Sequence, residues 1–128
     1  EIKKIFDDNQ IKYMICGGTL LGALTTGKFI PWDDDFYVCI FEEDYDKAIN
    51  CLLNNLSPNT ICQCVKSDKK YYLGWIKIRD KNSHVYPDCP AFKENGVWID
   101  IYKLVKTDEK DIPYLIAKES IHVCGKLY

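Results

Sequence analysis

The hydrophobic residues of this 128-residue chain switch several times between helical and strand spacing. Apolar residues three or four positions apart predict a helix at the N-terminus, a second from the glycine pair Gly17–Gly18 to near Gly27, and a third from Glu42 to Leu56. Runs of β-prone residues predict strands over residues 11–16, 36–40, 61–65, 71–80 and 97–104. This order of elements predicts an α/β or α+β domain with a mixed sheet flanked by helices.

The same pattern assigns side chains to faces. Leu20, Leu21 and Leu24 mark one apolar face of the second helix. Strand alternation places Lys77 and Arg79 on one face of residues 71–80, and it places Trp98, Asp100 and Tyr102 together on residues 97–104. A long loop is expected over residues 81–95, and a last helix over residues 114–120.

Length and composition limit the kinds of protein that fit. A chain of 128 residues with 47% hydrophobic and 28% charged residues is typical of a single globular domain. The net charge of -2 gives no basic surplus for nucleic-acid binding, and no apolar run approaches the ~20 residues of a membrane span. No secretory leader is visible and the sequence begins at Glu1 without Met, so we interpret residues 1–128 as one domain of a longer chain.

The seven cysteines are odd in number and lie mostly in apolar runs. That distribution favours buried, reduced thiols, and with them a reducing compartment such as the cytoplasm, over a disulfide framework. Cys62 and Cys64 are too isolated from other ligands to predict a zinc site.

Candidate chemistry is concentrated between Gly17 and Asp35. A helix that starts at a glycine pair presents free N–H groups to an anion. Asp33 and Asp35, two residues apart before a strand, project to one side and can hold a hard cation such as Mg²⁺. Together these features indicate a site for a phosphate and a metal. Each has an ordinary alternative: the glycines can form a simple turn, and the three aspartates can form a solvated acidic loop.

Three segments resemble the LicD/fukutin family. "GGTLLGALTTGKFIPWDDD" (residues 17–35) is similar to the long family signature, "WIKIRDKNS" (residues 75–83) to its lysine-containing strand, and "VWIDIYKL" (residues 97–104) to its "IDIFPL" strand. The three matches occur in the family's order and cover most of the chain. The resemblance implies a nucleotidyltransferase-like fold.

The resemblance also implies an activity. Family members transfer a phosphocholine or phospho-alditol group from a CDP-linked donor to a hydroxyl of a glycan or glycolipid, with Mg²⁺ or Mn²⁺. Carried over by position, Asp33 and Asp35 would bind the metal, and Asp100 would complete the catalytic carboxylates, most plausibly as the proton acceptor. The donor phosphates would lie against five further residues: Gly17, Gly18, Thr19, Lys77 and Arg79. For Lys77 and Arg79 a solvated strand face is the alternative.

Two positions depart from the family pattern. Tyr37 stands where the family has a further Asp, and Thr25 stands where it has an Arg. A phenol with a pKa of about 10 supplies neither negative charge nor a base at neutral pH. Three hypotheses follow: an active phosphotransferase, which we favour slightly, a degenerate domain without catalysis, and a nucleotidyltransferase acting on a small molecule or protein.

Overall fold

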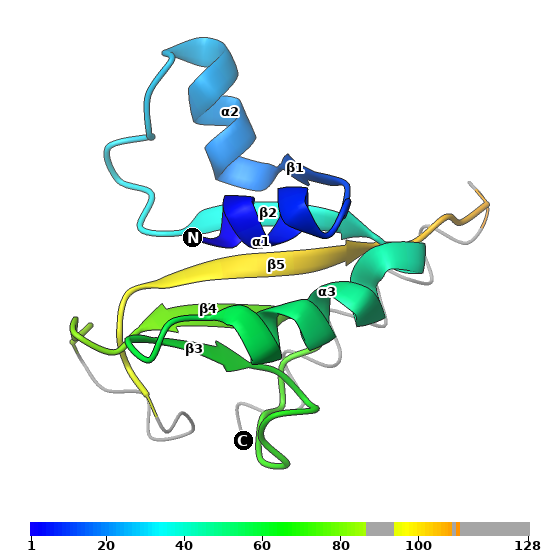
Figure 1. Ribbon diagram of the computed structural model, residues 1–128. Coiled ribbons are helices and arrows are strands. Elements are labelled where there is room, and N and C mark those ends of the chain that lie inside the picture. The colour runs from blue at the N-terminus through cyan, green and yellow to red at the C-terminus, as the bar shows by residue number, and fades with distance from the viewer. Residues whose placement is uncertain (87–93, 109, 111–128) are drawn as a thin grey trace.

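The computed structural model describes residues 1–86, 94–108 and 110. Within this part of the chain, three helices and five strands follow one another in the predicted order (Figure 1). They are α1 (Ile2–Asp8), β1 (Tyr13–Ile15), α2 (Gly17–Thr25), β2 (Phe36–Phe41), α3 (Glu42–Asn55), β3 (Thr60–Gln63), β4 (Ile76–Asp80) and β5 (Trp98–Leu104).

The five strands form one mixed sheet in the order β1-β2-β5-β4-β3. The central strands β2 and β5 run parallel, and the other three pairings are antiparallel. A mixed sheet with three helices is an α+β fold, so the predicted fold class is confirmed. Helix α2 contacts the sheet near β2 and extends away from it, whereas α1 and α3 lie across one face (Figure 1).

The two faces of the sheet differ in chemistry. The face under α1 and α3 carries the core, in which Phe6 of α1 and Leu52 of α3 pack with apolar residues of β2, β3, β4 and β5: Val38, Ile40, Cys62, Ile76, Ile78 and Ile101. Because side chains alternate along a strand, the intervening positions point to the opposite face. Those positions include Tyr37, Asp100, Lys77 and Gln63, which are register neighbours across β2, β5, β4 and β3. The candidate chemistry therefore lies on the face opposite the core.

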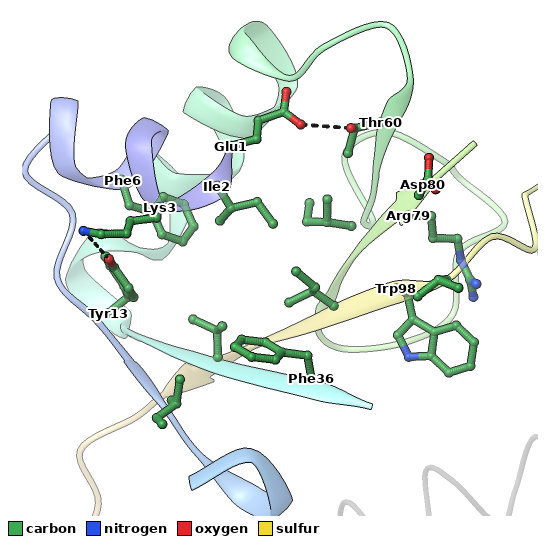
Figure 2. A pocket seen from close by; sticks show the side chains of 15 residues that line it. Glu1, Ile2, Lys3, Phe6, Tyr13, Phe36, Thr60, Arg79, Asp80 and Trp98 are labelled. Atoms are coloured by element: carbon green, nitrogen blue, oxygen red, sulfur yellow. Dashed lines mark hydrogen bonds between the residues drawn. The ribbon is translucent and has the colours of Figure 1, made fainter. Parts of the chain in front are cut away.

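An apolar groove opens beside α1 on the core face of the sheet (Figure 2). Its volume is about 530 Å³, and Ile2, Phe6, Phe36, Val38 and Ile99 are among its lining residues. Phe36, Val38 and Ile99 alternate with Tyr37 and Asp100 along their strands. The groove therefore lies on the opposite side of the sheet from the polar row, the line of residues Tyr37, Asp100, Lys77 and Gln63.

Two predictions were wrong in detail. The strand predicted over residues 71–80 is β4 alone: residues 69 and 70 form a turn closed by the bond from Tyr71 N–H to the carbonyl of Asp68, and residues 74 and 75 form a bend. The predicted apolar face of α2 is not buried: Leu20, Leu21 and Leu24 are 38%, 54% and 77% exposed. The residues of α2 that are buried are Thr19 and Gly22.

Some predictions fall outside the described residues: the helix over residues 114–120, most of the loop over residues 81–95, and the thiols of Cys89 and Cys124. Of the cysteines that the structure describes, Cys39, Cys62 and Cys64 are buried, Cys16 and Cys51 are half-buried, and none is bridged. None of the described helices has the length and apolar character needed to cross a membrane.

Candidate active site

The loop before β2 positions the acidic residues. Asp33 N–H donates to the carbonyl of Ile30 over 3.0 Å, which closes a turn around Pro31 and Trp32. Proline is favoured at the second position of such a turn because its φ is already fixed. After the turn, the chain alternates into β2, so that Asp33 and Asp35 are half-buried while Asp34 is exposed. Asp33 and Asp35 thus share one side, as the sequence predicts, although they precede the strand.

The start of α2 lies directly against this acidic loop. Gly17 has a φ of +54°, in the left-handed region that favours glycine, and a Cβ there would lie 3.2 Å from the ring of Tyr37. A Cβ on Gly18 would lie only 1.9 Å from Asp33 Oδ2. The two glycines therefore allow Tyr37 and the Asp33 carboxylate to approach the helix backbone closely. They do more than form a turn.

Thr19 connects the same helix start to β2. Its Oγ1 accepts a hydrogen bond of 2.8 Å from Tyr37 N–H, and the residue is buried. The Tyr37 carbonyl in turn accepts a bond from Cys16 N–H, the residue before α2. Thr19 therefore holds the start of α2 against β2.

Tyr37 occupies the position where the family pattern has a carboxylate. Its Oη donates to Asp35 Oδ2 over 2.7 Å, and its ring stacks on Tyr102 at a centroid distance of 6.0 Å. The hydrogen bond to Asp35 and partial burial raise the pKa of Tyr37 well above its usual value, so the phenol remains a donor at neutral pH. Trp75 extends the aromatic row, with its ring 5.3 Å from that of Tyr102.

Asp100 lies beside Tyr37 on the neighbouring strand and is bound to Lys77 on the next one. Lys77 Nζ donates to Asp100 Oδ1 over 2.7 Å, and both side chains are buried. Burial raises the pKa of Asp100 and lowers the pKa of Lys77, while the ion pair opposes both shifts. Tyr37 bonds to Asp35 and is the register partner of Asp100. It therefore connects the two carboxylates despite their separation in sequence.

Lys77 and Arg79 are not on a solvated strand face, which corrects that alternative. The Arg79 guanidinium is buried, donating from Nε to Gln63 Oε1 over 2.6 Å and from Nη1 to the carbonyl of Gly96 over 2.8 Å. It also lies over the ring of Trp98 at 4.9 Å. These contacts account for Arg79 as a residue that joins β3, β4 and the approach to β5. Gln63 is a partner that the sequence analysis did not identify, because nothing in the strand pattern marks a glutamine as the acceptor of a buried arginine.

Thr25, the other departure from the family pattern, lies at the opposite end of α2 from the glycines. Its Oγ1 donates to the carbonyl of Leu21 within the helix, and the residue is exposed. A nine-residue helix rises about 12 Å from its first residue to its last. Thr25 therefore does not contact the acidic cluster, by which we mean Asp33, Asp35 and Asp100.

The residues present fit a divalent cation with a small protein ligand set. Asp35 Oδ1 is buried and has no hydrogen-bond partner among the residues that the structure describes. Asp33 lies on the same side of the loop, and its charge acts on Tyr37 together with that of Asp35. Mg²⁺ commonly binds through one or two carboxylates and keeps its remaining positions for water and phosphate oxygens. In residues 1–86, 94–108 and 110, no group of three or more His, Cys, Asp or Glu side chains is arranged to hold a metal.

Comparison with known proteins decides the family. The model of the family described as "LicD/FKTN/FKRP, nucleotidyltransferase domain" matches residues 10–120. The chain belongs to the LicD family. A 41-residue segment is also 42% identical to the lipopolysaccharide cholinephosphotransferase LicD of Haemophilus influenzae. That segment covers 32% of this chain and 16% of the LicD protein, so the chain matches only a small part of this relative's length.

Proposed function

We propose that this LicD domain is a metal-dependent phosphotransferase that moves a phosphocholine or phospho-alditol group from a CDP-linked donor to a hydroxyl of a glycan or glycolipid. The observation that carries the proposal is the buried Asp35 Oδ1, which has no hydrogen-bond partner among the described residues, while Asp35 Oδ2 bonds to Tyr37, the register partner of Asp100. A carboxylate oxygen in that position favours a cation, and a cation beside a helix start favours phosphate. The printed name of the Haemophilus relative, a cholinephosphotransferase, supports the same class of reaction.

Each residue would have a limited task in this reaction. Mg²⁺ or Mn²⁺ held by Asp33 and Asp35 would neutralise the charge of the donor pyrophosphate. Gly17 and Gly18 would leave the α2 backbone clear for Tyr37 and Asp33, so that the Asp33 carboxylate lies beside the helix start near which the donor phosphates would bind. Asp100 would accept the proton of the attacking hydroxyl, because burial raises the pKa of its carboxyl group above the ordinary value. The hydroxyl oxygen would form the new P–O bond as the pyrophosphate P–O bond breaks, and CMP would leave. Lys77 would hold Asp100 in place through their 2.7 Å hydrogen bond.

This arrangement changes two of the roles expected from the family. Lys77 is paired with the Asp100 carboxylate, and two donors of the Arg79 guanidinium are bonded to Gln63 and to the carbonyl of Gly96. We therefore assign Lys77 to the positioning of Asp100 and Arg79 to the sheet. Positioning and charge stabilisation remain the main sources of catalysis in this proposal.

The test is a binding titration followed by a transfer assay. Calorimetry with CTP, CDP-choline and CDP-ribitol, each with Mg²⁺ and with excess chelator, should show metal-dependent binding of at least one CDP-linked compound. Asp35→Asn should abolish that dependence. Asp34→Asn is the matched control, because Asp34 has the same charge and is exposed in the same loop. Equal binding with and without metal in the unmodified domain would contradict the proposal.

A second candidate function is ligand binding without catalysis. It is favoured by the internal contacts of two carboxylates: Asp35 Oδ2 accepts from Tyr37, and Asp100 Oδ1 accepts from Lys77. Under this hypothesis a CDP-linked compound binds with Mg²⁺ but is not consumed. Mass spectrometry of the donor, after incubation with glycan and glycolipid hydroxyl acceptors, separates the two functions.

A further inference from the structure

Tyr37 is held beside Asp35 and Asp100 through both its backbone and its side chain. Its backbone N–H bonds to Thr19 Oγ1, its carbonyl accepts from Cys16 N–H, and its register partner on β5 is Asp100. Its ring stacks on Tyr102, and it lies so close to Gly17 that a Cβ there would be 3.2 Å from the ring. Because the ring and the backbone are both held, the phenolic oxygen has a fixed position.

The phenol uses that fixed position to bind one oxygen of Asp35. Tyr37 Oη donates to Asp35 Oδ2 over 2.7 Å, while Asp35 Oδ1 is buried and lacks a hydrogen-bond partner in the described part of the chain. A carboxylate with both oxygens free can rotate about its terminal torsion, which is broad. With Oδ2 fixed, the orientation of Oδ1 is fixed too.

We infer that Tyr37 is a positioning residue for the cation: it holds Asp35 so that Oδ1 alone is presented as a ligand. The inference rests on the proposed function, because it requires Asp35 to bind the metal. It also gives a physical role to the departure from the family pattern. The site has one carboxylate fewer than the family pattern. Tyr37, which stands in place of that carboxylate, instead orients the Asp35 carboxylate.

Partners that orient metal ligands through hydrogen bonds have measurable effects on affinity. Removing such a partner commonly weakens metal binding about 10- to 100-fold, although the ligand itself is unchanged. The Tyr37 contact is one hydrogen bond, from a neutral phenol to a half-buried carboxylate, so we expect the lower end of that range. A purely structural tyrosine would change stability and leave metal affinity alone.

The experiment compares Tyr37→Phe with Tyr102→Phe in titrations with Mn²⁺. The electron paramagnetic resonance signal of the free ion measures how much Mn²⁺ is bound at each step. Both substitutions remove one hydroxyl and keep the stacked rings, but only Tyr37 donates a hydrogen bond to Asp35. We expect Tyr37→Phe to weaken Mn²⁺ binding about 10-fold and Tyr102→Phe to change it less than about twofold. Thermal unfolding of both variants verifies that the domain remains folded.

Asp35→Asn in the same titration separates the inference from the function on which it rests. If Asp35→Asn abolishes Mn²⁺ binding and Tyr37→Phe binds like the unmodified domain, the inference is overturned and the metal site stands. If Asp35→Asn leaves Mn²⁺ binding intact, the metal site itself is misassigned, and the role of Tyr37 is overturned with it.

Discussion

Lys77 Nζ lies 2.7 Å from Asp100 Oδ1, and the two side chains are only 8% and 4% exposed. A buried ion pair of this kind is expensive to desolvate and is maintained only while both charges are present. The Lys77 ammonium also lies 4.4 Å from the centroid of the Trp98 ring, which gives it a second favourable contact. The pair joins β4 to β5, the strand that carries Asp100 in the candidate site.

Removing one member of this pair should be strongly destabilising. We expect Lys77→Met to lower the free energy of unfolding by about 3–5 kcal/mol, because it leaves the Asp100 carboxylate buried without its counter-charge. Urea denaturation measures the loss. Lys103→Met is the control: the Lys103–Glu42 pair is 3.3 Å apart and 40% and 52% exposed, so its loss should cost less than about 1 kcal/mol. Equal losses of unfolding free energy in the two variants would contradict the expectation that the buried pair contributes more to stability than the exposed pair.

A methyl group on Gly18 should disturb Asp33 without unfolding the domain. The Cβ of Gly18→Ala would lie 1.9 Å from Asp33 Oδ2, and the carboxylate is the flexible end of a side chain that can rotate away. We expect Mn²⁺ affinity to fall severalfold or more while the thermal midpoint changes little, if Asp33 is a ligand. Gly74→Ala is a matched control, since nothing lies within 4 Å of a Cβ there. An unchanged Mn²⁺ affinity in Gly18→Ala would exclude Asp33 as a ligand.

The sequence predicts the order of the elements and the polar row because both depend on local periodicity. The alternation within "VWIDIYKL" places Asp100 opposite the core, and the register of β2 with β5 then brings it beside Tyr37. Periodicity cannot reveal which partner a buried polar group finds. The Lys77–Asp100 pair and the Arg79–Gln63 bond join different strands, and their pairing is set by strand register that no local pattern contains.

The errors have the same origin. Tyr71, Leu73 and Trp75 alternate like a strand, yet the turn from Asp68 to Tyr71 and the bend at Gly74 prevent pairing before Ile76. Leu20, Leu21 and Leu24 have the spacing of a buried face, but the buried positions of α2 are the small residues Thr19 and Gly22. Gly22 is required there because a Cβ would lie 2.5 Å from the carbonyl of Lys28. Close backbone contact decides which side of this helix faces the protein.

Acid should weaken the attachment of α1 to the β3 end of the sheet. The Glu1 carboxylate accepts hydrogen bonds from Ser57 N–H and from Thr60 Oγ1, and these bonds lower the pKa of Glu1 below 4.5. Because the folded-state pKa is the lower one, the stabilisation is present above the unfolded value and is lost as pH falls through the folded value. We expect Glu1→Gln to reduce the thermal midpoint at about pH 6 and to have little effect at about pH 3. An effect of equal size at both pH values would contradict this assignment, and Glu43→Gln in the exposed first turn of α3 is the control.

The described cysteines should react with an alkylating reagent in an order set by burial. Cys16 and Cys51 are half-buried, whereas Cys39, Cys62 and Cys64 are buried. Peptide mapping after brief alkylation of the native, unreduced protein should therefore find labels first on Cys16 and Cys51. A bridged peptide containing any of the five would contradict the prediction of free thiols.

Restoring a carboxylate at position 37 tests how this chain differs from the family pattern. The register of β2 with β5 places residue 37 beside Asp100, and the side chain of Tyr37 reaches Asp35, so an aspartate there would face the same cluster. Tyr37→Asp removes the bond that orients Asp35 but adds a negative ligand, and the added charge should dominate for a divalent cation. We expect Mn²⁺ to bind several times more tightly, and any transfer from a CDP-linked donor to rise with it. Asp35→Asn in the Tyr37→Asp background should abolish the gain. If a folded Tyr37→Asp variant binds Mn²⁺ no more tightly than Tyr37→Phe, a carboxylate at position 37 does not bind the metal, and the alignment of the family's carboxylates with this strand is wrong.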